Sequence, residues 1–215
     1  MDWLEVIKQV SILIGIWVAI YGIDAWRREH IGKRQLELAE DTLALFYEAS
    51  DAVKYMRNPI SHSHETDNIE QGDQETEAEF QARKNASVVF HRYNQYQELF
   101  NKIHASRYRF MSQIGKSESA AFYDLRNIVN EIVISARILI RLWAREHFSD
   151  AERWEKHRAQ IVKHEAIFWE GLEEGDPINP KIDKVISDIE KTCKSIIAGK
   201  GSMHGFLNMK LGKRS

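Results

Sequence analysis

Apolar residues follow one another near the start of the chain, and no charge interrupts the run from Gln9 to Ile23 (QVSILIGIWVAIYGI). As an α-helix this run is about 20 Å long, whereas the hydrocarbon core of a bilayer is roughly 30 Å thick. Extending the helix over Trp3–Trp26 gives about 35 Å. The charges that the extension adds, Glu5, Lys8 and Asp24, lie near its ends, where they can reach the lipid headgroups. The pattern therefore predicts a membrane-spanning helix.

The residue types in this helix favour insertion. Aliphatic side chains each lower the free energy of insertion, and aromatic rings suit the two membrane interfaces. Apolar residues occur on all sides, which disfavours an amphipathic helix lying on the surface; a buried helix of a soluble bundle is the other alternative. We expect residues 1–27 to form a transmembrane anchor that contacts lipid through Trp3, Ile12, Ile16, Ile20 and Trp26.

Positive charge is concentrated after the apolar run, at Arg27, Arg28, Lys33 and Arg34, while Lys8 alone precedes it. Because Lys and Arg are enriched on the cytoplasmic side, we expect a single-pass protein of the inner (plasma) membrane with its C-terminal domain in the cytoplasm. The first residues are mixed in charge and no A-x-A pattern follows the run, so a cleaved signal peptide is not expected.

Small residues recur along one side of the anchor, at Ser11, Gly15, Ala19 and Gly22. Such a stripe lets transmembrane helices approach closely, which would make the protein a homo-oligomer. Alternatively, Gly and Ala are simply frequent in membrane helices. The sequence leaves both interpretations open.

Helical periodicity continues through most of the remaining chain. The first helix is expected to run from the anchor to Met56, with Gly32 as its weak point and Asn58-Pro59 as its stop. Ile60 to Glu75 is polar and acidic, so we interpret residues 60–75 as a flexible loop. Four further helices are expected, the second of them with the cleanest coiled-coil-like spacing and therefore central: 76–115, from about 117 to 143, 149–175 with a capping box at Ser149, and 179–199 with Asn179 as N-cap.

The expected fold is therefore all-α: a single transmembrane helix that continues into a cytosolic antiparallel bundle of four to five helices over residues 28–199. A basic and apolar tail, 200–215, follows. The chain has 215 residues, 29% of them charged, with a formal net charge of −2, which is not the basic field of a nucleic-acid-binding protein. The single cysteine, Cys193, excludes an intrachain disulfide.

Two histidines are the best candidates for chemistry. His157 and His164 are seven residues apart and fall on one helix face, where they could bind a metal together with Glu131 and Glu165. The Glu-x-x-His pattern of di-iron bundles is absent. The simpler interpretation is that both histidines are hydrogen-bonded at the edge of the core.

Arginines on apolar stripes also need an explanation. Arg107 lies on the stripe of the 76–115 helix and Arg137 beside the stripe of the next, and each is expected to pair with a carboxylate such as Glu131 or Asp124. The tyrosines and arginines around Arg92 and Arg107 are interpreted as core plus solvated flank, and His62 and His64 in the acidic loop as solvated.

No phosphate loop, G-x-G-x-x-G, H-E-x-x-H or G-x-S-x-G motif occurs, so no cofactor is expected. The sequence favours a non-enzymatic scaffold or effector module that binds the lipid bilayer and a protein partner or a second copy of itself, and no nucleic acid. The alternatives are a metal- or ligand-binding bundle, possibly an enzyme, that uses His157 and His164, and a pore-forming subunit of the kind found in bacterial defence systems.

Overall fold

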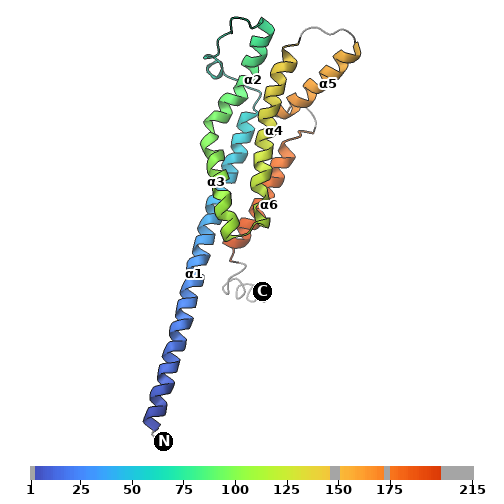
Figure 1. Cartoon of the computed structure of the whole chain (residues 1–215). Coiled ribbons are helices and arrows are strands. Elements are labelled where there is room, and N and C mark those ends of the chain that lie inside the picture. The colour runs from blue at the N-terminus through green and yellow to red at the C-terminus, as the bar shows by residue number, and fades with distance from the viewer. Residues whose placement is uncertain (1–2, 146–150, 172–174, 200–215) are drawn as a thin grey trace. The chain divides into compact units, whose positions relative to one another are not determined.

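Figure 1 presents a computed structural model, which describes residues 3–145, 151–171 and 175–199. All regular structure within these residues is helical, with six α-helices, two short 3-10 helices and no strand, so the predicted all-α class is confirmed. The described residues divide into two compact units, residues 3–41 with 194–199 and residues 42–193. The predicted cap at Ser149 and the predicted tail 200–215 lie outside the described residues.

The helices occupy most of the described chain. Their bounds are α1 Trp3–Met56, η1 Ser63–Glu65, α2 Glu77–Gln95, α3 Gln97–Gln113, η2 Ser117–Ser119, α4 Ala120–Trp143, α5 Ala151–Phe168 and α6 Asn179–Ile197.

The first helix is continuous from Trp3 to Met56, as predicted, and Gly32 does not interrupt it. Within the second unit its buried side chains are spaced by three and four residues, at Phe46, Ala49, Val53 and Met56, and none is more than 1% exposed. This spacing places them on one face of the helix, which contributes to the core of that unit.

The predicted 76–115 helix is wrong in one respect, because it is broken at Tyr96 into α2 and α3. The Tyr96 N–H donates to the carbonyl of Tyr93 at 3.1 Å, three residues back, and the backbone leaves the helical region at φ −103° and ψ 9°. The Tyr96 ring lies 5.8 Å from that of Tyr55 on α1. No Gly or Pro marks the break, so periodicity alone could not find it.

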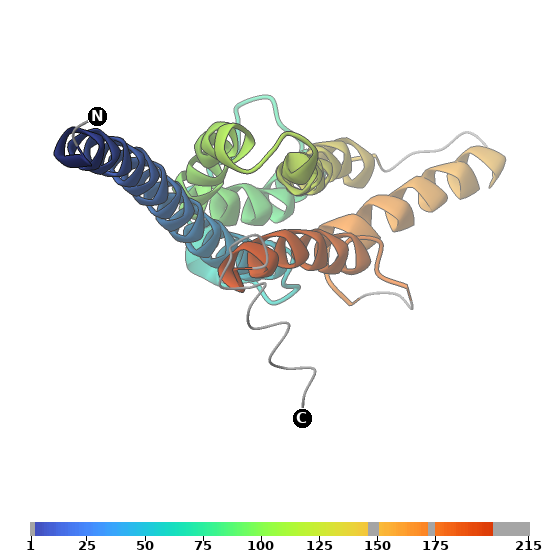
Figure 2. The same ribbon diagram turned by 90° about the horizontal axis from the view of Figure 1, so that it is seen from below.

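As predicted, α4 is central. In the second unit it packs against α2 on one side and α5 on another, with α3 also in contact (Figures 1 and 2). Phe122 on α4 meets Phe46 of α1 edge-on at 4.9 Å and Phe110 of α3 at 5.1 Å, so three helices share one aromatic cluster. The regular three-and-four spacing of α4 buries at least one residue in every turn from Ala121 to Leu139.

The acidic segment 60–75 is held at both ends. Glu65 in η1 is 3% exposed and accepts from Arg92 of α2, while Glu75 accepts from Arg83 of the same helix at 2.6 and 2.7 Å. Thr76 and Glu79 form the predicted capping box at the start of α2. Flexibility between the two ends stays a prediction.

The start of α6 differs from the sequence interpretation. The side chain that accepts at this helix start is Asp176, whose Oδ1 receives the N–H groups of Ile178 and Asn179, each at 2.8 Å. Asn179 instead uses its side chain toward Arg57 and Glu170. The predicted stop holds, because Gly199 takes a positive φ of 65° after the last turn.

Candidate functional site

The apolar segment of α1 is exposed around its whole circumference. Every residue from Gln9 to Arg34 is exposed, including Ile12 at 62% and Ile20 at 59%, and both flanking tryptophans, Trp3 and Trp26, are exposed as well. By length and composition this is the one helix among the described residues that could cross a membrane. A signal sequence near the N-terminus would pass the same test.

The small-residue stripe lies on this exposed segment. A Cβ added at Gly15 or Gly22 would meet nothing within 4 Å, and Ser11 donates its hydroxyl to the Ile7 carbonyl of its own helix. No contact within the chain therefore requires a small residue at either glycine. An interface through Ser11, Gly15, Ala19 and Gly22 stays a prediction.

The basic cluster after the apolar run is also exposed. Lys33 lies 4.0 Å from Glu37 one turn along the helix, and the guanidinium of Arg28 lies 6.0 Å from the ring centre of Tyr21. Arg27 and Arg34 have no ion pair within the residues that the structure describes. Exposed ion pairs of this kind contribute little, so the cluster keeps its positive charge.

The structure places His157 and His164 on α5, but gives them different partners. His157 is buried and its Nε2 lies 2.9 Å from the Leu142 carbonyl, so this nitrogen is the donor. His164 Nδ1 lies 3.1 Å from the Ser135 hydroxyl, and burial, followed by the nearby Lys163 charge, lowers its pKa. Seven residues separate them, which is about 10 Å along the helix axis.

The carboxylates that could have completed a metal site are engaged elsewhere. Glu131 binds Lys181 of α6 at 2.6 Å, and Glu165 accepts from the indole of Trp143 at 2.8 Å. Across the described parts of the chain, no group of three or more His, Cys, Asp or Glu could hold a metal ion. The geometry thus agrees with the simpler interpretation, and metal binding by His157 and His164 stays a prediction.

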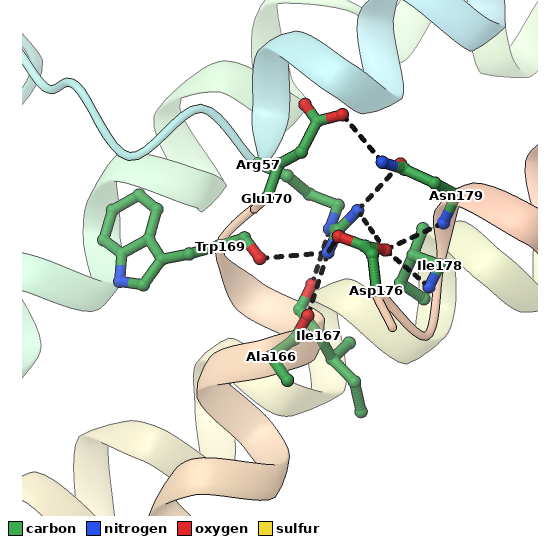
Figure 3. A network of polar contacts seen from close by, with 8 residues as sticks. All are labelled: Arg57, Ala166, Ile167, Trp169, Glu170, Asp176, Ile178 and Asn179. Atoms are coloured by element: carbon green, nitrogen blue, oxygen red, sulfur yellow. Dashed lines mark hydrogen bonds and ion pairs between the residues drawn. The ribbon is translucent and has the colours of Figure 1, made fainter. Parts of the chain in front are cut away.

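The most extensive polar network surrounds Arg57, one residue beyond α1 (Figure 3). This side chain is fully buried, and its guanidinium donates to Asp176 through both terminal nitrogens, at 2.7 and 3.0 Å. It also donates to the Asn179 side chain at 3.1 Å and to three carbonyls at the end of α5, those of Ala166, Ile167 and Trp169. Arg57 therefore fixes the α5–α6 connection to the end of α1.

Asp176 balances the charge in this network. Burial by itself would raise the pKa of Asp176, but the hydrogen bonds from Arg57 and from the Asn179 and Ile178 N–H groups outweigh it and lower that pKa. The carboxylate is thus ionised at neutral pH, and Arg57 and Asp176 form a buried ion pair. The Arg57 carbonyl also accepts from the Glu170 N–H at 2.8 Å.

Arg92 forms a second buried cluster, and here the sequence interpretation of a solvated flank was wrong. The residue is 1% exposed and donates to Glu65 at 2.6 and 3.0 Å. It also donates to the carbonyl of Tyr55 in the last turn of α1 and to the carbonyls of Asn58 and Ile60 just beyond that helix. The hydrogen bond from Arg92 is the largest cause of the lowered pKa of Glu65. Its position three residues after Val89, on the same helix face, was the signal that could have revealed its burial.

Arg107 is buried as predicted, at 7% exposure, but the expected carboxylate partner is wrong. Its guanidinium carbon lies 4.3 Å from the ring centre of Tyr123 and 4.7 Å from that of Tyr108, and its Nε has no hydrogen-bond partner in the described structure. Arg137, the other arginine singled out from the sequence, is exposed. Arg107 is therefore held by two aromatic rings instead of an anion.

Two further features carry no chemistry of their own. Cys193 is buried, which raises the pKa of its thiol to about 11 and makes it a poor nucleophile. A shallow cavity of about 860 Å³ near the start of α2 is lined by charged residues, but Arg83 there is paired with Glu75. The hydrogen bond from Arg83 is the main cause that lowers the pKa of Glu75 to about 2.

The described residues thus offer an exposed apolar helix segment and three buried arginines in different surroundings, and they bring together no recognisable catalytic group. No family model matches this sequence, and no curated protein and no solved structure matches it either.

Proposed function

We propose that this protein is a single-pass membrane protein whose C-terminal helical bundle lies on the cytoplasmic side and binds another protein, or a second copy of itself, at the inner face of the membrane. The observation that carries the proposal is the exposure of aliphatic side chains all round α1 between Gln9 and Ile23. A protein partner on one side would leave the other sides in water, whereas lipid covers all of them.

The energy involved supports this location. Burying one Val, Leu or Ile side chain is worth about 1.5–3 kcal/mol. Several such residues in this segment are about half exposed or more, among them Val10, Leu13, Ile14, Ile16 and Ile23. Leaving all of them in water would forgo a free energy comparable with the 5–15 kcal/mol that typically stabilises a whole domain.

Carbonate extraction of membranes that contain the full chain tests the location. The protein is expected to stay in the pellet, and a variant with Ile16→Asp and Ile20→Asp is expected in the supernatant, because each charge at the centre of the span costs about 2.5–3.5 kcal/mol. The matched control carries Ile60→Asp and Ile134→Asp, two exposed positions outside the span. Release of the unaltered protein by carbonate would refute the anchor. An N-terminal tag lost from the mature chain would instead indicate a cleaved signal sequence.

Orientation is tested by fusing a phosphatase that is active only outside the cytoplasm to the C-terminus. We expect no phosphatase activity from the unaltered fusion. Activity should appear when Arg27, Arg28, Lys33 and Arg34 are all replaced by Gln, because the positive charges that keep the C-terminal side in the cytoplasm are then lost. High activity of the unaltered fusion would contradict the cytoplasmic assignment.

Self-association is tested with Gly15→Leu. Since a side chain there meets nothing within the chain, any change in oligomeric state reports a contact between copies. Gly32→Leu is the matched control, because Gly32 is equally open but lies outside the apolar run. An unchanged oligomeric state for Gly15→Leu would remove the stripe as an interface and leave a different protein as the partner.

A further inference from the structure

Two rows of side chains face each other along α3 and α4, and we call the space between them the α3–α4 furrow. The row on α3 is Asn101, His104 and Tyr108, and the row on α4 is Tyr123, Arg126 and Asn130. Spacings of three and four residues keep each row on one side of its helix. Four of the six residues line one small cavity, and the two tyrosines flank the Arg107 guanidinium.

The cavity has an apolar floor and a polar rim. Its volume is about 180 Å³, and its floor includes Phe122, Leu125 and Val129. A dry cavity of about 150 Å³ can hold a benzene molecule, whereas pockets for drug-sized ligands have about 300–1,000 Å³. The cavity therefore suits one large apolar side chain and not a cofactor.

Arg107 lies next to this cavity. The ring of His104, at the cavity rim, contacts that of Tyr108 at 6.1 Å, and Tyr108 flanks the guanidinium. The two tyrosine rings, which are 59% and 50% exposed, make cation–π contacts that do not use the N–H groups of Arg107. Arg57 and Arg92 each donate to an ionised carboxylate, whereas the described residues supply none to Arg107.

The charge of the furrow is uncompensated. No acidic residue lines the cavity, and Arg126 at its rim is exposed and has no ion pair within the described chain. A planar guanidinium held between rings presents its donors along one edge, which matches the two oxygens of a carboxylate. By charge, the basic tail 200–215 is a poor occupant for this site.

We propose that the α3–α4 furrow binds a segment of a partner protein that carries one large apolar side chain beside a carboxylate. The apolar side chain fills the cavity, Arg107 binds the carboxylate through its two terminal nitrogens, since its Nε is enclosed, and Arg126 adds attraction at the rim. Because Arg107 follows His104 by about one helical turn, roughly 5 Å, the two anchors of the partner lie one or two residues apart, at about 3.3 Å per extended residue. This inference rests on the proposed protein-binding function and identifies the surface and the chemistry of the partner.

The test uses the full chain in phosphatidylcholine nanodiscs and a phage library of random dodecapeptides as the probe. Enriched peptides are expected to place Phe, Tyr, Trp, Leu or Ile within three residues of Asp or Glu. Their affinity is expected to fall roughly tenfold or more with Arg107→Lys, which keeps the charge but loses the paired N–H donors of the guanidinium. A similar loss is expected with Asn101→Trp, because the indole covers the cavity from its rim. Arg109→Gln, an exposed arginine of the same helix, is the matched control and is expected to leave affinity unchanged.

Circular dichroism first establishes that each variant is folded. If Arg107→Lys does not fold, Asn101→Trp and Arg126→Gln decide the outcome, because both positions are exposed. Peptides that bind equally well to all variants would overturn this inference and leave the protein-binding function standing. Failure to enrich any peptide would count against both. Displacement of the bound peptides by micromolar glycerol phosphate, a soluble analogue of an anionic lipid headgroup, would assign the furrow to such a headgroup and overturn the proposal.

Discussion

Replacing Arg57 with Met is expected to destabilise the bundle more than any exposed substitution. The guanidinium makes six hydrogen bonds while fully buried, two of them to the Asp176 carboxylate. Met has a similar shape but no donors, so it leaves Asp176 and three backbone carbonyls without their partner. Removing one member of a buried ion pair costs about 3–5 kcal/mol. This is a large part of the 5–15 kcal/mol that typically stabilises a domain.

The measurement is urea unfolding of the full chain in detergent micelles, followed by circular dichroism and tryptophan fluorescence to check two-state behaviour. Arg137→Met is the matched control, since Arg137 is exposed, and its effect is expected within about 0.5 kcal/mol. A loss below about 1 kcal/mol for Arg57→Met, or a loss equal to that of the control, would refute the reasoning that this network stabilises the fold.

A double-mutant cycle separates the ion pair from the rest of the network. Asp176→Asn keeps the Oδ1 acceptor for the Ile178 and Asn179 N–H groups, and it removes the charge together with the Oδ2 acceptor of one Arg57 hydrogen bond. In the Arg57→Met background, Asp176→Asn should lower the free energy of unfolding by about 1–3 kcal/mol less than it does in the unaltered protein. Purely additive effects would show that the two side chains are not coupled.

The acid dependence follows from the lowered pKa of Asp176. The folded protein binds fewer protons than the unfolded chain near and below the ordinary value of 3.8, so the contribution of the pair is complete above that pH and is lost as pH falls toward the folded pKa. Arg57→Met should therefore flatten the acid side of the stability curve, and an unchanged slope would contradict the ion pair.

Three further predictions concern single residues. Arg92→Met should cost about 3–5 kcal/mol in the same unfolding assay and should also weaken the loss of stability in acid, because the pKa of Glu65 is then no longer lowered by this partner. Cys193 should resist iodoacetamide at pH 8 in the folded protein and react on unfolding, since its pKa is raised to about 11; rapid labelling of the folded chain would disprove its burial. His164→Gln should reduce the rise of stability with increasing pH below about 6.5, because the lowered pKa means that the unfolded chain binds more protons there; an unchanged pH profile would exclude this origin.

Sequence periodicity identified most of the helices, because each buries a stripe over several turns. The exceptions have physical causes. The break at Tyr96 occurs where a ring contact with Tyr55 and the neighbouring Arg92 cluster hold the chain, and neither is visible in a local pattern. The cap of α6 was assigned to Asn179 because this residue type suits the position, but Asp176 lies closer to the free N–H groups. A long-range contact decided the break at Tyr96, and a local choice between two capping residues decided the start of α6.

The three buried arginines illustrate why the candidate site was harder to predict than the fold. Spacing on a helix can indicate that an arginine faces the core, and it did so correctly for Arg107. It cannot indicate whether a carboxylate from a distant segment will meet the arginine. Asp176 is 119 positions from Arg57 and Glu65 is 27 from Arg92, while no such residue reaches Arg107 within the described chain.

The two paired arginines, Arg57 and Arg92, together hold the C-terminal end of α1 in place. A helix ends with carbonyls that lack partners and with partial negative charge, which a cation can satisfy. Arg92 donates to one carbonyl in the last turn of α1 and to two in the segment that follows it, and Arg57, the first residue after α1, donates to the α5–α6 connection. Each guanidinium is balanced by one acid, Glu65 or Asp176, so neither charge is left alone. Apolar residues of similar volume could stabilise this junction as well, but they would not specify its geometry, since hydrogen bonds are directional and apolar contacts are not. The bundle thus depends most on directional hydrogen bonds at the end of α1. A conservative substitution there should lower the stability of the bundle the most.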